Sequence, residues 1–122
     1  LSIIERISLI NGNPEDINGH GTAVFGVIGA VINREGLIGV SPDVDLFSVK
    51  ISENILGNLS DAIDGVDWSI ENGINIISMS FGMESYSQIF REVLEDAYDH
   101  DIFINSCCWK QWKKPDTLSS SL

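Results

Sequence analysis

The order of apolar segments in this chain constrains its fold more than any other feature of the sequence. Residues 44–50, 74–80 and 102–105 are short runs rich in β-branched and aromatic side chains, as expected for strands. Between them, residues 58–72 and 86–99 repeat apolar side chains at three- and four-residue spacing, which predicts helices. Strands that alternate with helices in this order are joined by right-handed crossovers. The sequence therefore predicts an α/β fold with a parallel sheet.

The two helices between these strands each have one apolar face. The first also has residues at each end that are typical of helix caps. Asn58 or Ser60 can cap the start of the first helix, and Gly73 follows its end where a left-handed glycine is common. Its inward face is expected to hold Leu59, Ile63, Val66 and Ile70. The inward face of the second is expected to hold Ile89, Val93, Leu94 and Ala97.

A further helix is expected over residues 20–32, between two loops at residues 11–19 and 33–43. Val24, Val27, Ile28 and Val31 lie on one face of that helix. Gly26 and Gly29 each cost it about 1 kcal/mol relative to alanine. They also let another backbone approach closely, so we expect this helix to be buried.

The composition bounds the class of protein. The chain has 122 residues, of which 43% are hydrophobic, and its mean hydropathy is +0.11, which excludes a wholly disordered chain and predicts one domain or a piece of one. Eighteen acidic residues against seven basic ones give a net charge of −11, so we expect no nucleic acid and no anionic membrane as partner. The apolar runs are too short for a transmembrane helix.

The first six residues mix an acid and a base into a short apolar stretch, so we expect no signal peptide there. Secreted and cytoplasmic locations both stay open. The absence of Met at position 1 fits a fragment, a processed chain or an unusual start codon.

The residues most informative about chemistry are 18–22, Asn-Gly-His-Gly-Thr, at the mouth of the helix predicted from residue 20. The flanking glycines leave the imidazole of His20 uncovered, and the positive end of a helix disfavours its protonated form, which suits a general base. The plainer alternative is an exposed histidine in a capping loop. A dinucleotide site is disfavoured, because Val24 stands where the third glycine should be and a loop precedes the motif.

Three segments, in order, resemble the subtilisin-like serine proteases (subtilases, peptidase family S8). Residues 18–26, N-G-H-G-T-A-V-F-G, are similar to the family's histidine motif N-G-H-G-T-H-V-A-G. Residues 39–43 and 47–50 resemble its G-V-A-P loop and the following strand, and residues 75–82, N-I-I-S-M-S-F-G, resemble its strand D-V-I-N-M-S-L-G. The resemblance is strongest over residues 17–106. It implies a three-layer subtilisin-like α/β fold, incomplete here, with residues 1–106 forming a partial peptidase domain.

The resemblance also assigns roles. It implies that His20 is the general base of an Asp/His/Ser triad that hydrolyses peptide bonds through an acyl-enzyme. It implies that Ser80, Phe81 and Gly82 bind substrate through their backbone, as an added strand would pair with an extended polypeptide. The plainer interpretation of these three residues is a strand that ends in a turn.

The chain departs from the family at the other triad positions. Neither the aspartate motif, D-T-G or D-S-G, nor the serine motif G-T-S-M-A is present. Asp16 precedes His20 by four residues in the same loop, whereas the orienting carboxylate should come from a separate strand. Lys110 stands at the position of the oxyanion-hole asparagine, where its long stem makes the geometry unsuitable. We therefore expect this chain to be inactive by itself.

Residues 107–122 form a divergent tail, for which we hypothesise a compensated frameshift or a sequencing error. Residues 107–114 read Cys-Cys-Trp-Lys-Gln-Trp-Lys-Lys, and suitable codons for them, shifted by one base, encode Ala-Ala-Gly-Asn-Asn-Gly-Lys, the family's oxyanion segment. Two alternatives are disfavoured. Cys107 and Cys108 with His100 are poorly spaced for a metal, and the charge of a nucleic-acid patch of Lys and Trp is outweighed by the net charge.

No cofactor is expected. Family members hold structural calcium in a loop after the histidine helix, but residues 33–37 are short and contain a base, so calcium is not supported here. Polypeptide is the expected substrate. Two rival functions stay open: a non-catalytic module that binds peptides or pairs with a complementary fragment, and a degraded gene product without function.

Overall fold

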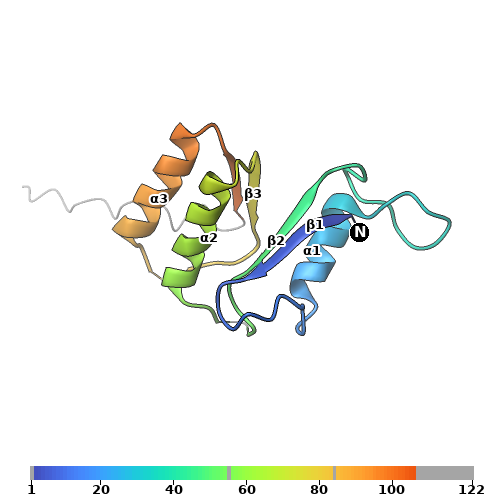
Figure 1. The fold of residues 1–122 in the computed structure, drawn as a ribbon, viewed down its shortest axis with the longest axis horizontal. Coiled ribbons are helices and arrows are strands. Elements are labelled where there is room, and N and C mark those ends of the chain that lie inside the picture. The colour runs from blue at the N-terminus through green and yellow to red at the C-terminus, as the bar shows by residue number, and fades with distance from the viewer. Residues whose placement is uncertain (1, 55, 84, 107–122) are drawn as a thin grey trace, which may run out of the picture. The chain divides into compact units, whose positions relative to one another are not determined.

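The computed structural model describes residues 2–54, 56–83 and 85–106. The chain divides into two compact units, residues 1–65 and residues 66 onward, and each is described by itself. The first contains β1 (Ile3–Ser8), α1 (His20–Gly29) and β2 (Leu46–Lys50), and α2 (Leu59–Glu71) crosses the division. The second continues with β3 (Ile76–Met79), α3 (Gln88–Asp99) and β4 (Phe103–Ser106), as Figure 1 shows.

The first unit is built on a parallel pair of strands, β1 and β2. Ile7 lies opposite Val49 and Ser8 opposite Lys50, with a register irregularity between Ile3 and Glu5. The sequence patterns do not predict β1, because Glu5 and Arg6 interrupt its apolar residues and its middle is exposed. Parallel pairing with β2 gives this short, charged segment its strand conformation.

Helix α1 differs from the prediction in length and in burial. It ends at Gly29 because Ala30 leaves the helical region, with φ −59° and ψ 127°. Within the described chain, Gly29 is its one buried residue, and Val27 is 69% exposed, so the prediction of a buried helix is wrong. A two-stranded sheet is too narrow to cover a helix along its length.

The two helical glycines behave differently. A Cβ atom on Gly29 would lie 3.1 Å from the side chains of both Leu46 and Val44, so β2 and the residues before it approach α1 at this point. A Cβ atom on Gly26 would meet nothing within 4 Å among the described residues. The predicted close approach is therefore correct for Gly29 and wrong for Gly26.

The second unit pairs β3 and β4 in parallel, with Ile76 opposite Phe103 and Met79 opposite Ser106. Helix α3 follows its predicted range closely, and Ser87 caps it by accepting a hydrogen bond from the backbone N–H of Phe90 at 3.2 Å. The apolar core of this unit contains Val66, Met79, Phe90, Ala97 and Ile102.

One predicted core residue of α3 is misplaced. Ile89 is 65% exposed, whereas Phe90 beside it has no exposed surface. Phe90, Val93, Leu94 and Ala97 form a stripe at three- and four-residue spacing that the sequence equally allowed. The larger aromatic side chain takes the inward position.

The α/β class with parallel strands is confirmed, and the described strands form two parallel pairs, β1–β2 and β3–β4. Gly73 has the left-handed backbone expected after α2, with φ 64°. Within the part of the chain that the structure describes, no helix is both long and apolar enough to cross a membrane.

Candidate functional site

The histidine singled out from the sequence opens a helix. His20 is the first residue of α1 and is exposed. Gly19, at the N-cap position, has φ 87°, a left-handed conformation that favours glycine. Gly19 has no side chain with which to cap the helix, so the amide groups of the first turn need another acceptor.

Asp16 supplies that acceptor. Its Oδ1 accepts a hydrogen bond from the backbone N–H of Gly19 at 2.8 Å. Its Oδ2 accepts from the backbone N–H of Thr22 at 2.7 Å and from the Thr22 hydroxyl at 2.6 Å. These bonds, the hydroxyl's first, lower the pKa of the Asp16 carboxyl below its usual value.

The carboxylate of Asp16 is thus a capping group for the turn that carries His20, and its charge also suits the positive end of the helix. The sequence offered it only as a poor substitute for the triad aspartate. No standard signal for this role is present in the sequence, because Asp16 lies three residues before the N-cap position, which Gly19 occupies.

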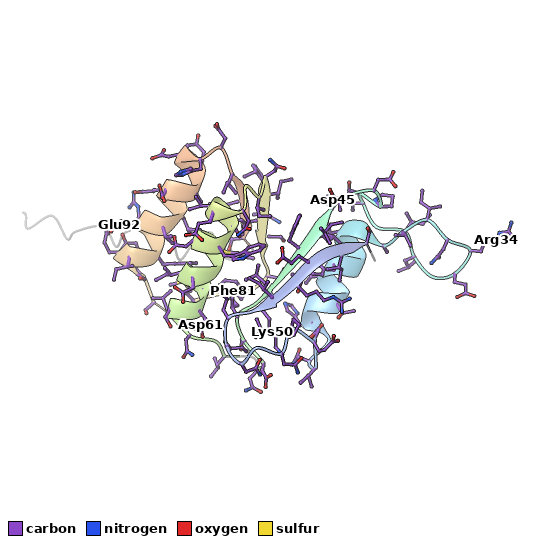
Figure 2. The ribbon with its side chains drawn as sticks, viewed as in Figure 1. Arg34, Asp45, Lys50, Asp61, Phe81 and Glu92 are labelled. Carbon is purple, nitrogen blue, oxygen red and sulfur yellow. The ribbon has the colours of Figure 1, made fainter. Side chains whose placement is uncertain are left out.

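The loop before His20 is attached to the end of β2. The Nζ atom of Lys50 donates to the backbone oxygen of Asn13 at 3.2 Å and to that of Glu15 at 2.8 Å. It also pairs with Glu53 at 3.1 Å, and this bond lowers the pKa of the Glu53 carboxyl. Lys50 lies at the carboxyl end of the β1–β2 sheet (Figure 2), so the loop passes the edge where sites in parallel sheets lie.

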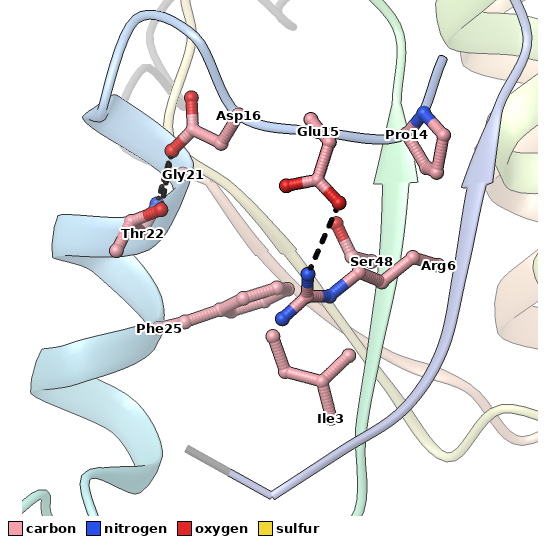
Figure 3. Close-up of a pocket in the computed structure, with 9 residues that line it drawn as sticks. All are labelled: Ile3, Arg6, Pro14, Glu15, Asp16, Gly21, Thr22, Phe25 and Ser48. Carbon is pink, nitrogen blue, oxygen red and sulfur yellow. Dashed lines mark hydrogen bonds and ion pairs between the residues drawn. The ribbon is translucent and has the colours of Figure 1, made fainter. Parts of the chain in front are cut away.

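A recess of about 240 Å³ lies between this loop, α1 and the two strands (Figure 3). The Arg6 guanidinium points to the Glu15 carboxylate, 3.6 Å away, at one side of it. The recess combines apolar and charged side chains. Its lining consists of Ile3, Arg6, Pro14, Glu15, Asp16, Gly21, Thr22, Phe25 and Ser48.

The predicted substrate-binding residues directly follow β3, as the sequence indicates. Ser80 and Phe81 are half-buried and Gly82 is exposed, in a stretch without helix or strand (Figure 2 labels Phe81). His20 belongs to the first unit and these residues to the second, so each is placed only within its own unit.

Of the residues considered for the oxyanion hole or for a cysteine–histidine metal site, the structure describes only His100. Lys110, Cys107 and Cys108 lie outside the described residues. His100 follows α3, where its Nδ1 lies 2.8 Å from the backbone oxygen of Asp96 and 3.5 Å from that residue's carboxylate. No group of three or more metal-ligating side chains (His, Cys, Asp or Glu) occurs within residues 2–54, 56–83 and 85–106.

Comparison with known proteins adds an independent finding. The model of the subtilase family matches residues 8–119. The chain is 38% identical over 91 residues to the minor extracellular protease Epr of Bacillus subtilis (strain 168), covering 74% of this chain and 14% of that protein.

Two further relatives match over 107 residues, which is 85% of this chain. Subtilisin DY of Bacillus licheniformis is 33% identical, with 39% of its length covered. The thermostable alkaline protease of Halalkalibacterium halodurans is 37% identical, with 30% covered. The chain therefore spans well under half of each of these relatives.

Proposed function

Because this chain belongs to the subtilase family, we propose that it is the histidine-bearing part of a serine endopeptidase domain and that its substrate is polypeptide. The observation that carries the proposal is the setting of His20. Its imidazole is exposed on the first turn of α1, between two glycines, and Asp16 ties that turn to the preceding loop. A general base requires this combination of access and fixed position.

In the proposed mechanism, His20 takes the proton of a serine hydroxyl that a segment outside these residues supplies. The serine oxygen attacks the scissile carbonyl carbon, and His20 then passes the proton to the leaving amine as the acyl-enzyme forms. Water, deprotonated by the same imidazole, releases the acyl group. Ser80, Phe81 and Gly82 hold the extended substrate through backbone hydrogen bonds.

The carboxylate that orients the imidazole comes from elsewhere in this proposal. Both oxygens of Asp16 already accept hydrogen bonds from the helix start. With neither a D-T-G motif nor a G-T-S-M-A motif in its sequence, the chain by itself should neither hydrolyse casein nor be labelled by an active-site serine probe. Turnover or stoichiometric labelling contradicts this part of the proposal.

A hybrid enzyme tests the role of His20. Residues 8–106 of this chain replace the corresponding stretch of the thermostable alkaline protease, which supplies the remaining segments. We expect casein hydrolysis that falls about 10⁶-fold with His20→Ala. His100→Ala is the matched control and should leave the rate unchanged. A hybrid that hydrolyses casein equally well without His20 rules out the proposed base.

A peptide-binding or fragment-complementing module is the second candidate, favoured by the open strand edges. Among the described residues, each of the four strands is paired along one edge. Such an edge presents backbone groups that an extended peptide can pair with. The full chain should then bind an unfolded peptide, and Gly82→Pro should weaken binding by removing an N–H. Gly82→Ala, which keeps that N–H, is the control, and equal binding by both variants argues against this surface.

The origin of residues 107–122 is tested by sequencing the gene and the protein. We propose that residues 107–122 arose from a compensated frameshift or a sequencing error, and mass spectrometry of the peptide spanning residues 107–114, with resequencing, decides it. Codons that do not yield Ala-Ala-Gly-Asn in the shifted frame reject the idea. A degraded product without function is the third candidate, and it predicts aggregation through the open edges.

A further inference from the structure

A nearly buried ammonium group lies against the loop that leads to the histidine, and the mechanism above does not use it. We call residues 11–19 the histidine loop. Lys50, the last residue of β2, has a side chain that is only 9% exposed. Its three N–H groups face three oxygens: the backbone oxygens of Asn13 and Glu15 and the carboxylate of Glu53. An ammonium with three donors is fully satisfied by this arrangement.

The two contacts from Lys50 to backbone carbonyls are long-range, whereas most other hydrogen bonds of the loop join residues close in sequence. The side chain of Asn11 accepts from the N–H of Asn13 at 3.0 Å, and that of Asn13 accepts from the N–H of Glu15 at 3.1 Å. These bonds shape the loop but do not attach it to the sheet. Lys50 is separated from Asn13 and Glu15 by 37 and 35 residues, so its bonds do attach it.

The attachment of the loop to β1 is weaker. Arg6 of β1 pairs with the Glu15 carboxylate at 3.6 Å, and the two side chains are 48% and 69% exposed. Exposed pairs of this length contribute little. The hydrogen bonds of Lys50 are charge-assisted and come from a side chain that is only 9% exposed, which makes them the stronger constraint.

The constraint reaches the imidazole through a short series of contacts. Lys50 holds the carbonyl of Glu15, and the next residue, Asp16, holds the amides of Gly19 and Thr22 on either side of His20. We propose that Lys50 is a positioning residue for His20: it sets where the histidine loop, and therefore the imidazole, lies relative to the carboxyl end of β2. The functional meaning of this proposal rests on the proposed role of His20 as a base, for which a displacement of about 1 Å can cost about 100-fold in rate.

Glu53 offsets the cost of burying the Lys50 ammonium group. An unpaired buried ammonium is costly, and Glu53 offsets that cost as an ion-pair partner. Its carboxylate also accepts a hydrogen bond from the side chain of Asn11, at the start of the histidine loop. Glu53 thus balances the charge and holds the start of the loop at Asn11. The backbone contacts of Lys50 hold the part of the loop nearer to His20.

The test follows His20 by nuclear magnetic resonance in the isotopically labelled full chain, with His100 as an internal reference outside the first unit. In Lys50→Met, which keeps the apolar stem, we expect the His20 ring signals to move by more than their line width. The amide protons of Gly19 and Thr22, which Asp16 holds, should exchange about tenfold faster or more. The His100 signals should not change.

Two matched variants separate positioning from general stability. Lys50→Arg, which restores donors for the carbonyl oxygens, should return the His20 signals toward their wild-type positions. Glu53→Gln, which removes the ion pair but leaves both carbonyl contacts, should displace them less than Lys50→Met does. If Lys50→Met does not fold, Lys50→Leu, which also lacks a donor, takes its place under the same criteria.

The proposal is overturned if a folded Lys50→Met chain keeps wild-type His20 signals and wild-type exchange at Gly19 and Thr22. This outcome is independent of catalysis, because no hydrolysis is measured. A ring that moves in a chain whose hybrid shows no His20-dependent hydrolysis supports the positioning role and defeats the protease proposal. If the ring does not move in Lys50→Met but the hybrid shows His20-dependent hydrolysis, the positioning role is defeated and the protease proposal stands.

Discussion

The two units of this chain hold their helices by different means. In the second unit, α3 buries Phe90 and Ala97 completely, and Met79 and Ile102 of the same unit are 5% and 4% exposed. In the first, α1 buries only Gly29 among its described residues, and its start is held by the hydrogen bonds of Asp16. Apolar burial stabilises a helix without fixing the direction of any one group, whereas hydrogen bonds fix direction at a small gain in stability. Helix α1, which carries the histidine, therefore depends more on directional contacts than α3 does.

The largest expected effect tests the apolar side of this contrast. Phe90→Ala should lower the free energy of unfolding by about 3–5 kcal/mol, because it opens a cavity in the core of the second unit. Denaturant unfolding measures the change. Ile89→Ala, one residue away but 65% exposed, is the matched control and should cost less than about 1 kcal/mol. Equal losses contradict the assignment of the inward face.

The second test concerns a backbone contact in the first unit. A Cβ atom at Gly39 would lie 2.4 Å from the backbone nitrogen of Ala30 and 2.6 Å from that of Gly29. Because backbone atoms cannot move aside cheaply, Gly39→Ala should destabilise the chain by about 1–3 kcal/mol. At Gly26 a Cβ atom would meet no described residue within 4 Å, so Gly26→Ala should instead stabilise by up to about 1 kcal/mol, by helix propensity. Two thermal unfolding curves that shift the same way disprove the contrast.

The third test removes the cap that holds the histidine turn. Asp16→Ala should cost about 1–2 kcal/mol, because the amides of Gly19 and Thr22 lose their acceptor. Hydrogen exchange at those two amides should accelerate, while exchange in α3 should not. Asp16→Asn keeps one acceptor oxygen, so its stability should lie between those of the wild type and Asp16→Ala.

The same carboxylate predicts a pH dependence. Since hydrogen bonds lower the pKa of Asp16 in the folded chain, its contribution is complete above the unfolded value near 3.8. That contribution is lost as the pH falls through the lower folded-state pKa. The difference in stability between wild type and Asp16→Ala should therefore be constant above about pH 5 and shrink toward pH 2. A difference that grows on acidification contradicts the direction of the shift.

The smallest effect comes from the corresponding cap in the second unit. Ser87 holds one amide of α3, that of Phe90, so Ser87→Ala should cost about 0.5–1 kcal/mol. Ser87→Thr keeps the hydroxyl and should be nearly neutral. If Ser87→Ala costs as much as Asp16→Ala, the first unit does not depend on its polar contacts more than the second does.

Much of the fold was predictable, because helices and buried strands carry their periodicity in the local sequence. The predicted helix at residues 58–72 is α2, Leu59–Glu71, and the predicted left-handed glycine after it is Gly73. Strand β1 was missed since its residues, Ile3–Ser8, have no clear alternation, and pairing with β2 makes it a strand. The burial of α1 was mispredicted because an apolar face indicates what a helix can bury, not what lies next to it.

For the candidate site, the sequence by itself determined the chemistry available: a histidine between two glycines at a helix start, and a backbone segment after a strand. Its resemblance to a family gave both a proposed role. Tertiary structure decided what holds that histidine. The Asp16 cap is a local contact between residues six apart, whereas the link from Lys50 to the histidine loop joins residues 35 apart. The physical reason is that residue type and spacing encode local conformation, whereas the partner of a side chain about 35 residues away depends on how the chain packs.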